Sequence, residues 1–233
     1  MNEKNRKTLE QIKGGLIVSC QALEDEPLHD SYIMSRMAFA ASEGGAVGIR
    51  ANTVEDIREI KKTVNLPIIG IIKKVYPDSA VYITPTVDEV DALYNEGVDI
   101  IAVDATNRAR PSWVSFEEFF TQIRKKYPEQ LFMADTSCFE EGELALKLGC
   151  DLIGTTMCGY TPYTKGETIP AFSLMKRYKQ ELNATVIAEG GIWYPEQLVK
   201  AYESGAFSCV IGTAITRPRD ITRRFVSYLE KGE

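Results

Sequence analysis

Histidine is almost absent from this chain, since His29 is the only one among 233 residues. Most catalytic zinc and non-haem iron sites use two or more imidazoles, so this scarcity disfavours metal enzymes of those classes. The five cysteines are scattered without any Cys-x-x-Cys pair, and a chain of this length does not need a disulfide framework. We therefore expect reduced thiols and a mechanism that uses no metal.

Long apolar runs are also missing, because no stretch approaches the roughly 18 residues of a membrane span. The segment from Met1 to Lys13 lacks the apolar core and the small-residue cleavage site of a secretory signal. The net charge of -6 argues against nucleic acid as the main partner, because duplex binding relies on clustered lysine and arginine. We expect a cytoplasmic protein that meets any anionic ligand with a local cluster of positive groups.

Short β-branched runs alternate with longer amphipathic stretches, which is typical of repeated βα units and a parallel sheet. Several runs are apolar throughout, as strands covered on both faces should be. The predicted strands are Leu16–Ser19, Ala46–Arg50, Pro67–Ile72, Ile100–Asp104, Leu131–Ala134, Leu152–Thr155, Thr185–Ala188 and Ser208–Ile211. Eight such units predict an α/β fold of the (β/α)8 TIM-barrel type, with residues 1–233 as a single domain and residues 1–14 as an N-terminal extension packing at the barrel.

The main alternative architecture is an open doubly wound sheet. Its nucleotide fingerprint Gly-x-Gly-x-x-Gly would follow the first strand, where Val18-Ser-Cys-Gln21 stands instead. Glycines close several of the intervening helical stretches, each shortly before a new strand, and are predicted to be left-handed helix caps. These glycines are Gly44, Gly97, Gly149 and Gly205.

Polar residues collect where the predicted strands end, which is the edge at which this architecture places its chemistry. They are Gln21, Arg50, Lys73, Asp104, Asp135, Thr155, Thr156, Glu189, Gly212, Thr213 and Arg217. One charged residue at a strand end is usually solvated or paired with a neighbour. Cations, carboxylates and hydroxyls gathered at one concave face instead favour a binding site.

Glycines at the last two strand ends point to a phosphate. Backbone N–H groups there are unobstructed at the place where barrels commonly bind a phosphoryl group, and Arg217 adds a charge-assisted donor. The predicted phosphate-binding residues are Gly190, Gly191, Gly212 and Thr213. The Tyr160-Thr-Pro-Tyr163 loop supplies hydroxyls and aromatic rings that suit closure over a ligand. We assign no function to His29, and we expect Trp193 only to pack.

Ordered motifs on all eight strands or their loops resemble the N-acylglucosamine-6-phosphate 2-epimerases, also called N-acetylmannosamine-6-phosphate epimerases. The resemblance extends from Gly15 to about Phe225. The motifs are Leu16-Ile-Val-Ser-Cys-Gln-Ala22, Glu26-Pro-Leu-His29, Ala46-Val-Gly-Ile-Arg-Ala51, Ile69-Gly-Ile-Ile-Lys73, Asp104-Ala-Thr106, Gly159-Tyr-Thr-Pro-Tyr163, Ile187-Ala-Glu-Gly190 and Ala214-Ile-Thr-Arg-Pro218.

This resemblance implies interconversion of N-acetylmannosamine 6-phosphate and N-acetylglucosamine 6-phosphate, a step in sialic acid breakdown, by a homodimer without metal or nucleotide cofactor. It assigns proton transfer to Lys73 and Glu189. Many relatives have a second glycine where Thr213 stands. The threonine side chain either adds a hydroxyl to the phosphate site or narrows that site. The substrate-binding positions that carry over are Gln21, Arg50, Asp135 and Arg217.

Epimerisation at C2 of the open-chain sugar needs one group to remove a proton and another to return one to the opposite face. Strands three and seven lie roughly opposite each other in a closed barrel, which suits Lys73 and Glu189. The chemistry also needs a lowered lysine pKa and a raised glutamate pKa, for which Arg50 and Asp135 are the candidate causes. Side chains alternate along a strand, so only one of Lys73 and Lys74 can point into the barrel mouth, and the family motif selects Lys73. Besides Lys74, Asp104 is an alternative candidate for the acid/base role.

Other functions remain to be separated from this one. A metal-dependent pentose-phosphate epimerase would need paired histidines, which this chain lacks. Another phosphosugar isomerase on the same barrel, or a sugar-phosphate binding protein without activity, are the remaining alternatives. Retention of both Lys73 and Glu189 argues against the binding protein.

Overall fold

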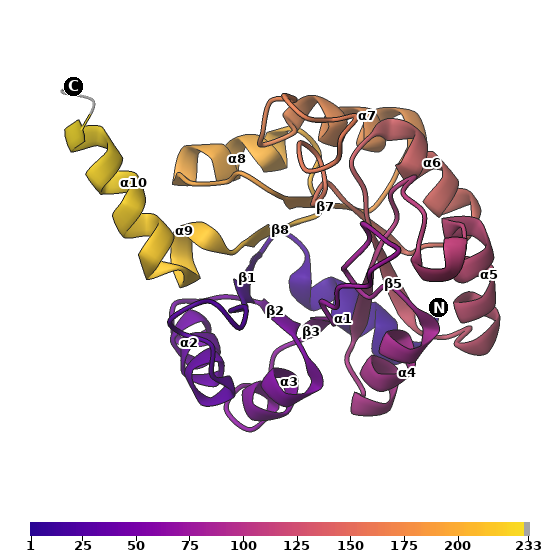
Figure 1. The fold of residues 1–233 in the computed structure, drawn as a ribbon, viewed down its shortest axis with the longest axis horizontal. Coiled ribbons are helices and arrows are strands. Elements are labelled where there is room, and N and C mark those ends of the chain that lie inside the picture. Colours follow the sequence, from indigo (N-terminus) through magenta and orange to yellow (C-terminus); the bar gives the residue numbers. More distant parts are fainter. Residues whose placement is uncertain (231–233) are drawn as a thin grey trace.

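The computed structural model describes residues 1–230 and shows a closed barrel of eight strands in the order β1 to β8 (Figure 1). Each strand is parallel to the next, and β8 closes the barrel against β1. The predicted (β/α)8 barrel is confirmed. The strands are β1 Leu16–Cys20, β2 Gly48–Asn52, β3 Ile68–Ile71, β4 Ile100–Asp104, β5 Leu131–Asp135, β6 Leu152–Gly154, β7 Val186–Glu189 and β8 Ser208–Ile211.

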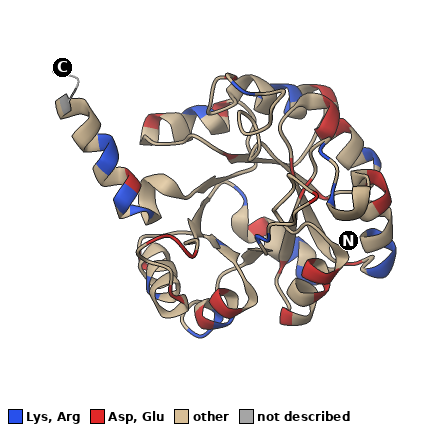
Figure 2. Cartoon of the chain, viewed as in Figure 1, with Lys and Arg blue, Asp and Glu red and all other residues tan. Residues whose placement is uncertain are grey.

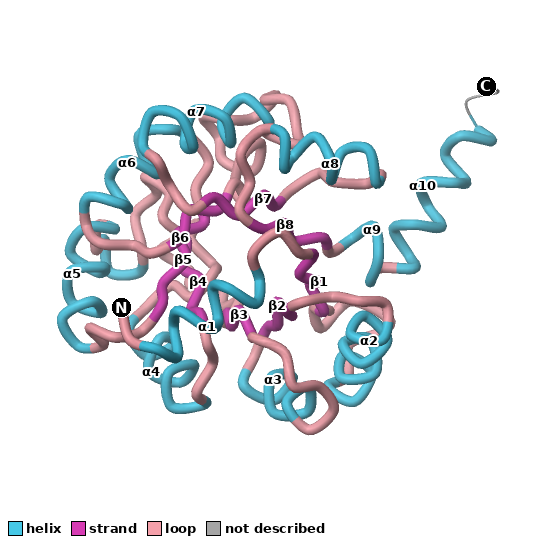
Figure 3. The backbone as a smooth tube through the Cα atoms, turned by 180° about the vertical axis from the view of Figure 1, so that it is seen from behind, coloured by secondary structure: helices cyan, strands magenta, loops and turns pink. Residues whose placement is uncertain are grey.

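Helices surround the barrel between successive strands (Figures 1 and 3). Four of the described helices begin with a reciprocal capping box. In α4 and α5 the pairs are Thr86 with Glu89 and Ser115 with Glu118, which satisfy backbone donors that a helix start leaves free. The helices are α1 Glu3–Ile12, α2 Ser31–Glu43, α3 Val54–Lys61, α4 Val87–Glu96, the 3-10 turn η1 Pro111–Trp113, α5 Phe116–Lys126, α6 Phe139–Lys147, α7 Phe172–Leu182, α8 Pro195–Glu203, α9 Thr213–Thr216 and α10 Pro218–Glu230.

The predicted glycine caps are only partly correct. Gly97 ends α4 in the left-handed conformation, and Gly149 and Gly205 are left-handed one residue after the residue that caps their helix. The prediction for Gly44 is wrong, because its φ of -76° is right-handed and its neighbour Gly45 takes the positive φ of 93°. Either glycine of the pair suits the turn, so the sequence does not distinguish them.

Two apolar layers explain why the strands are apolar on consecutive residues. Within β3, Ile69 and Ile71 belong to the cluster that fills the barrel, whereas Ile68 belongs to the cluster beneath the helices. Both side-chain directions are therefore buried, and each fully buried isoleucine contributes roughly 1.5–3 kcal/mol. The polar strand residues Arg50, Asp135 and Glu189 lie between the middle and the carboxyl end of their strands, so these functional groups are held by rigid elements.

The N-terminal helix α1 packs at the end of the barrel where the strands begin (Figure 3). Ile12 joins the inner cluster, and the carbonyl of Phe207 accepts a hydrogen bond of 2.8 Å from the Gly14 N–H just before β8. Asn5 Nδ2 donates to the carbonyl of Glu129 over 2.7 Å. Residues 1–14 thus fill the end of the barrel opposite the strand ends that bear the polar residues.

The last helix, α10, points away from the barrel instead of lying along it (Figure 1). Its apolar side chains Phe225 and Leu229 are 72% and 82% exposed, one helical turn apart. Lysines and arginines lie beside acidic residues on most outer helices, and α10 carries several arginines (Figure 2). Among residues 1–230, no helix has the length and apolar character needed to cross a bilayer.

Candidate active site

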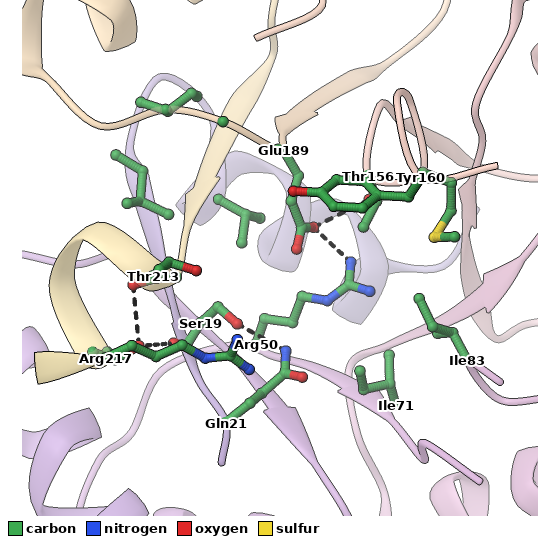
Figure 4. Close-up of a pocket in the computed structure, with 18 of the residues that line it drawn as sticks. Ser19, Gln21, Arg50, Ile71, Ile83, Thr156, Tyr160, Glu189, Thr213 and Arg217 are labelled. Atoms are coloured by element: carbon green, nitrogen blue, oxygen red, sulfur yellow. Dashed lines mark hydrogen bonds and ion pairs between the residues drawn. The ribbon is translucent and has the colours of Figure 1, made fainter. Parts of the chain in front are cut away.

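A cavity of about 380 Å³ opens at the carboxyl ends of the strands (Figure 4). Arg50 comes from β2, Lys73 follows β3, Thr156 follows β6 and Glu189 ends β7. The predicted site residues that line the cavity are Gln21, Arg50, Lys73, Glu189, Gly190, Gly191, Gly212, Thr213 and Arg217. The barrel therefore brings together residues that are up to 196 positions apart, from Gln21 to Arg217.

Arg50 is the centre of the ionic arrangement in this cavity. Its two terminal nitrogens donate to Asp135 over 2.6 and 3.0 Å, and Nη1 also donates to Glu189 Oε2 over 2.7 Å. Its side chain is 1% exposed, and a buried charge is tolerated because it is paired and hydrogen-bonded. Burial lowers the pKa of Arg50, but Asp135 and Glu189 raise it, so the guanidinium stays charged.

Asp135 does not form part of the cavity wall, although it was expected to contact substrate. It ends β5, is fully buried, and lies outside the residues that line the cavity. Its two oxygens accept from Arg50, and Oδ1 also accepts from Thr156 Oγ1 over 2.6 Å. In this geometry, Asp135 acts by holding Arg50 and Thr156.

Lys73 faces the cavity, whereas Lys74 does not. The backbone of Lys73 pairs in an antiparallel bridge with Ile83, and its N–H donates to Asn52 Oδ1 over 2.8 Å. Lys74 points the other way and pairs with Glu89 over 3.1 Å, with 54% of its side chain exposed. The alternation of side chains along the strand thus separates two lysines that sequence position alone leaves equivalent.

The ionisation of Lys73 and Glu189 is shifted in opposite directions. Burial, helped by Arg217 and Arg50, lowers the pKa of Lys73 to about 8 from its ordinary 10.5. Burial also raises the pKa of Glu189, and Asp135 adds to that rise against the opposing effect of Arg50. A lysine that loses its proton more readily than usual suits a general base, and a glutamate that keeps its proton to higher pH than usual suits a general acid.

The cavity residues that follow β7 and β8 suit an anion. Gly190 and Gly191 have φ values of 106° and 76°, which exposes backbone at the turn after β7. At Gly191, an added Cβ would lie 2.9 Å from Ile169, so a side chain does not fit there. Gly212 and Thr213 follow β8, and Arg217 Nη2 lies 3.3 Å from the carboxylate of Glu26.

Two further polar atoms of the cavity residues have no hydrogen-bond partner among the described residues. Gln21 Oε1 and Arg50 Nε are buried and have no hydrogen-bond partner within residues 1–230. The first can accept and the second can donate, and a buried group without a partner costs free energy.

Of the other residues singled out by the sequence, Asp104, His29 and Tyr163 do not line the cavity, whereas Tyr160 does. Asp104 is buried against Arg108, whose Nη2 donates to it over 2.6 Å, and does not line the cavity. His29 Nδ1 lies 3.1 Å from the carbonyl of Ala22. Tyr163 donates to Glu141 over 2.5 Å and thereby anchors the loop, while Tyr160 is exposed at the cavity rim.

Some cavity residues gave no usable signal in the sequence. Tyr82 and Ile83 enter the wall because residues 82–84 pair with residues 72–74, a contact that apolar periodicity does not reveal. Trp193, expected only to pack, also lines the cavity. Within residues 1–230, no three histidine, cysteine, aspartate or glutamate side chains are grouped to hold a metal ion.

Comparisons with known proteins place the chain in one family. Residues 34–231 match the family described as "Putative N-acetylmannosamine-6-phosphate epimerase". Proteins named "Putative N-acetylmannosamine-6-phosphate 2-epimerase" from Caldanaerobacter subterraneus subsp. tengcongensis and Borreliella afzelii are 53% and 54% identical over 223 and 226 residues. These matches cover 96% of this chain in both cases, and 94% and 97% of the relatives.

A solved structure agrees with these sequence matches. The N-acetylmannosamine-6-phosphate 2-epimerase from Clostridium perfringens superposes with a TM-score of 0.90 at 51% identity. The superposition covers 94% of this chain and 95% of that protein. The chain therefore belongs to the N-acetylmannosamine-6-phosphate epimerase family.

Proposed function

We propose that this protein is an epimerase that interconverts N-acetylmannosamine 6-phosphate and N-acetylglucosamine 6-phosphate, in sialic acid breakdown. The names of its relatives support this substrate pair. The observation that carries the proposal is the cavity in which Lys73, with its lowered pKa, and Glu189, with its raised pKa, share Arg50 as a neighbour. The proposed catalytic residues are thus Lys73 and Glu189.

The reaction needs no redox change. A base removes the C2 proton of the open-chain aldehyde, and the C–H electrons form the C1–C2 double bond while the carbonyl oxygen becomes an enolate. Arg50, the buried guanidinium nearest both carboxylates, supplies positive charge for that oxygen. The second group then returns a proton to the opposite face of C2, and the aldehyde re-forms.

The remaining cavity residues hold the sugar phosphate in the proposed complex. Gly190, Gly191, Gly212 and Thr213 offer backbone donors to the phosphoryl group, and Arg217 adds its charge. Gln21 accepts from a sugar hydroxyl through its free Oε1. Asp135 was proposed as a substrate-binding residue, and its burial behind Arg50 supports an indirect contribution.

The test is proton NMR of N-acetylmannosamine 6-phosphate with the protein in deuterated buffer containing a chelator. Formation of the gluco epimer with deuterium at C2 is the expected result. Lys73→Ala should abolish exchange of the C2 proton while retaining binding. Binding without turnover by the native protein would contradict the proposed activity, and full activity of Glu189→Gln would contradict the role of Glu189.

We also propose that the protein works in the cytoplasm as a homodimer in which α10 contacts the second copy. Phe225 and Leu229 expose a strongly apolar face on a helix that leaves its own barrel. Burying each such side chain contributes roughly 1.5–3 kcal/mol, and large exposed apolar patches commonly mark interfaces. The five free cysteines suit a reducing compartment.

Sedimentation velocity tests the dimer. The mass derived for the native protein should be twice that of one chain. The double variant Phe225→Glu with Leu229→Glu should give the mass of a monomer. Arg223→Glu is the matched control, because it changes charge on the same helix at a 69% exposed position. A native monomer, or a dimer that the double variant leaves intact, would refute this arrangement.

A further inference from the structure

Thr156 connects the two carboxyl groups that face Arg50. Its Oγ1 lies 2.6 Å from Asp135 Oδ1 and 3.3 Å from Glu189 Oε2. Arg50 Nη1 bridges the same two oxygens over 3.0 and 2.7 Å. The four groups thus form a closed ring. Figure 4 shows the part of it in which one carboxyl oxygen of Glu189 contacts both Thr156 and Arg50.

The threonine hydroxyl has one hydrogen and two possible acceptors in this ring. It can donate to only one of them, and the 2.6 Å contact assigns the donation to Asp135. A lone pair of Oγ1 then faces Glu189 Oε2. That lone pair repels an ionised Glu189 but accepts a hydrogen bond from a protonated one.

The two carboxyl groups are therefore not equivalent. Asp135 accepts three hydrogen bonds, two from the terminal nitrogens of Arg50 and one from Thr156. Glu189 has a single bond from Arg50 and the oxygen of Thr156 beyond it. Neighbouring carboxyl groups with different surroundings separate into one ionised and one protonated partner.

We infer that Thr156 is a positioning residue that keeps Glu189 protonated, by donating its own hydrogen to Asp135 and accepting one from Glu189. This inference rests on the proposed function, because a protonated Glu189 is the form that returns a proton to C2. A hydroxyl that donated to Glu189 instead would favour the ionised form, so the two orientations have opposite consequences.

Thr155 offers a matched control on the adjacent position. Its Oγ1 donates to the carbonyl of Glu189 over 2.9 Å and accepts from the Glu189 N–H over 3.2 Å. Thr155 therefore holds the backbone of Glu189, whereas Thr156 contacts its carboxyl group. Loss of either hydroxyl disturbs the placement of Glu189, but only loss of the second removes an acceptor for its proton.

The experiment compares the pH dependence of kcat/KM for the native protein with Thr156→Val, Thr156→Ser and Thr155→Val. The bend that Glu189 causes in the pH profile is first identified by its loss in Glu189→Gln. Thr156→Val should move the midpoint of this Glu189 bend down by about 0.5–1 pH unit, since one hydrogen bond to the protonated form is lost. Thr156→Ser should restore the midpoint, and Thr155→Val should leave it in place.

An unchanged or raised midpoint in Thr156→Val would overturn the inference. Carbon-13 NMR titration of the glutamate carboxyl groups, with Glu189 assigned by its loss in Glu189→Gln, gives the same midpoint without turnover and so serves if Thr156→Val is inactive. No turnover by the native protein would refute the proposed function, whereas turnover with an unmoved Glu189 titration in Thr156→Val would refute the role of Thr156 alone.

Discussion

The charge of Arg217 should set the pH at which Lys73 becomes a base. Arg217 is the charged neighbour that, after burial, does most to lower the pKa of Lys73 to about 8. Removing a positive charge stabilises the ammonium form, so Arg217→Gln should raise the Lys73 pKa by roughly half a unit. The neutral fraction of Lys73 at pH 7 would then fall from about 9% to about 3%.

The assay is kcat/KM across pH 6.5 to 10, measured by NMR from the conversion of N-acetylmannosamine 6-phosphate. The value of kcat/KM reports ionisation in the free enzyme, so the bend that Lys73 causes in the pH profile should lie near pH 8 in the native protein. In Arg217→Gln the bend should move to higher pH, and activity at pH 7 should fall about threefold from this cause alone. Weaker phosphate binding lowers the whole curve without moving the bend.

Arg219→Gln is the control for this prediction. Arg219 contacts the same carboxylate of Glu26 as Arg217, over 3.1 Å, but lies outside the cavity that contains Lys73. The bend should therefore stay in place in Arg219→Gln. The reasoning fails if Arg217→Gln leaves the bend unmoved, or if both variants shift it equally.

Three further outcomes are expected. Arg50→Met should lower the free energy of unfolding by about 3–5 kcal/mol in urea titrations, because Asp135 would keep a buried charge without its partner. The control Lys62→Ala, at an exposed ion pair, should change the free energy of unfolding by less than about 1 kcal/mol, and equal effects of the two variants would contradict this reasoning. Gly142→Ala should lower the free energy of unfolding by about 1–3 kcal/mol although alanine has the better helix propensity, because the new Cβ would lie 2.4 Å from the Tyr178 ring. A higher melting temperature of this variant would show that the ring moves freely. Dialysis against EDTA should leave turnover unchanged, and recovery of lost activity by added metal would refute the metal-free mechanism.

The barrel could be predicted from the sequence because burial on both strand faces leaves apolar residues at consecutive positions. Ile68 and Ile69 face different layers, yet both are buried, so their run is unambiguous. Turn details were harder, since Gly44 and Gly45 are equally able to adopt a positive φ and only the latter does. Such choices depend on the exact register with which a helix meets the next strand.

The site was predictable as a set of strand ends but not as a geometry. Spacing did not separate Lys73 from Lys74, because that choice depends on which side chain faces inward. Nor did it show that Asp135 lies behind Arg50, since both are simply polar residues at strand ends. Tyr82 enters through pairing between a loop and the residues after β3, which leaves no local pattern.

The helix at the opposite end of the barrel has a consequence for isotope exchange. Ile12 fills that end together with the inner cluster, so solvent reaches Lys73 and Glu189 from the mouth. A bound sugar that fills the mouth then slows the replacement of a proton on Lys73 by deuterium from the medium. Part of the abstracted hydrogen should consequently return to the starting sugar, and unreacted N-acetylmannosamine 6-phosphate should gain deuterium more slowly than the C2 bond is broken.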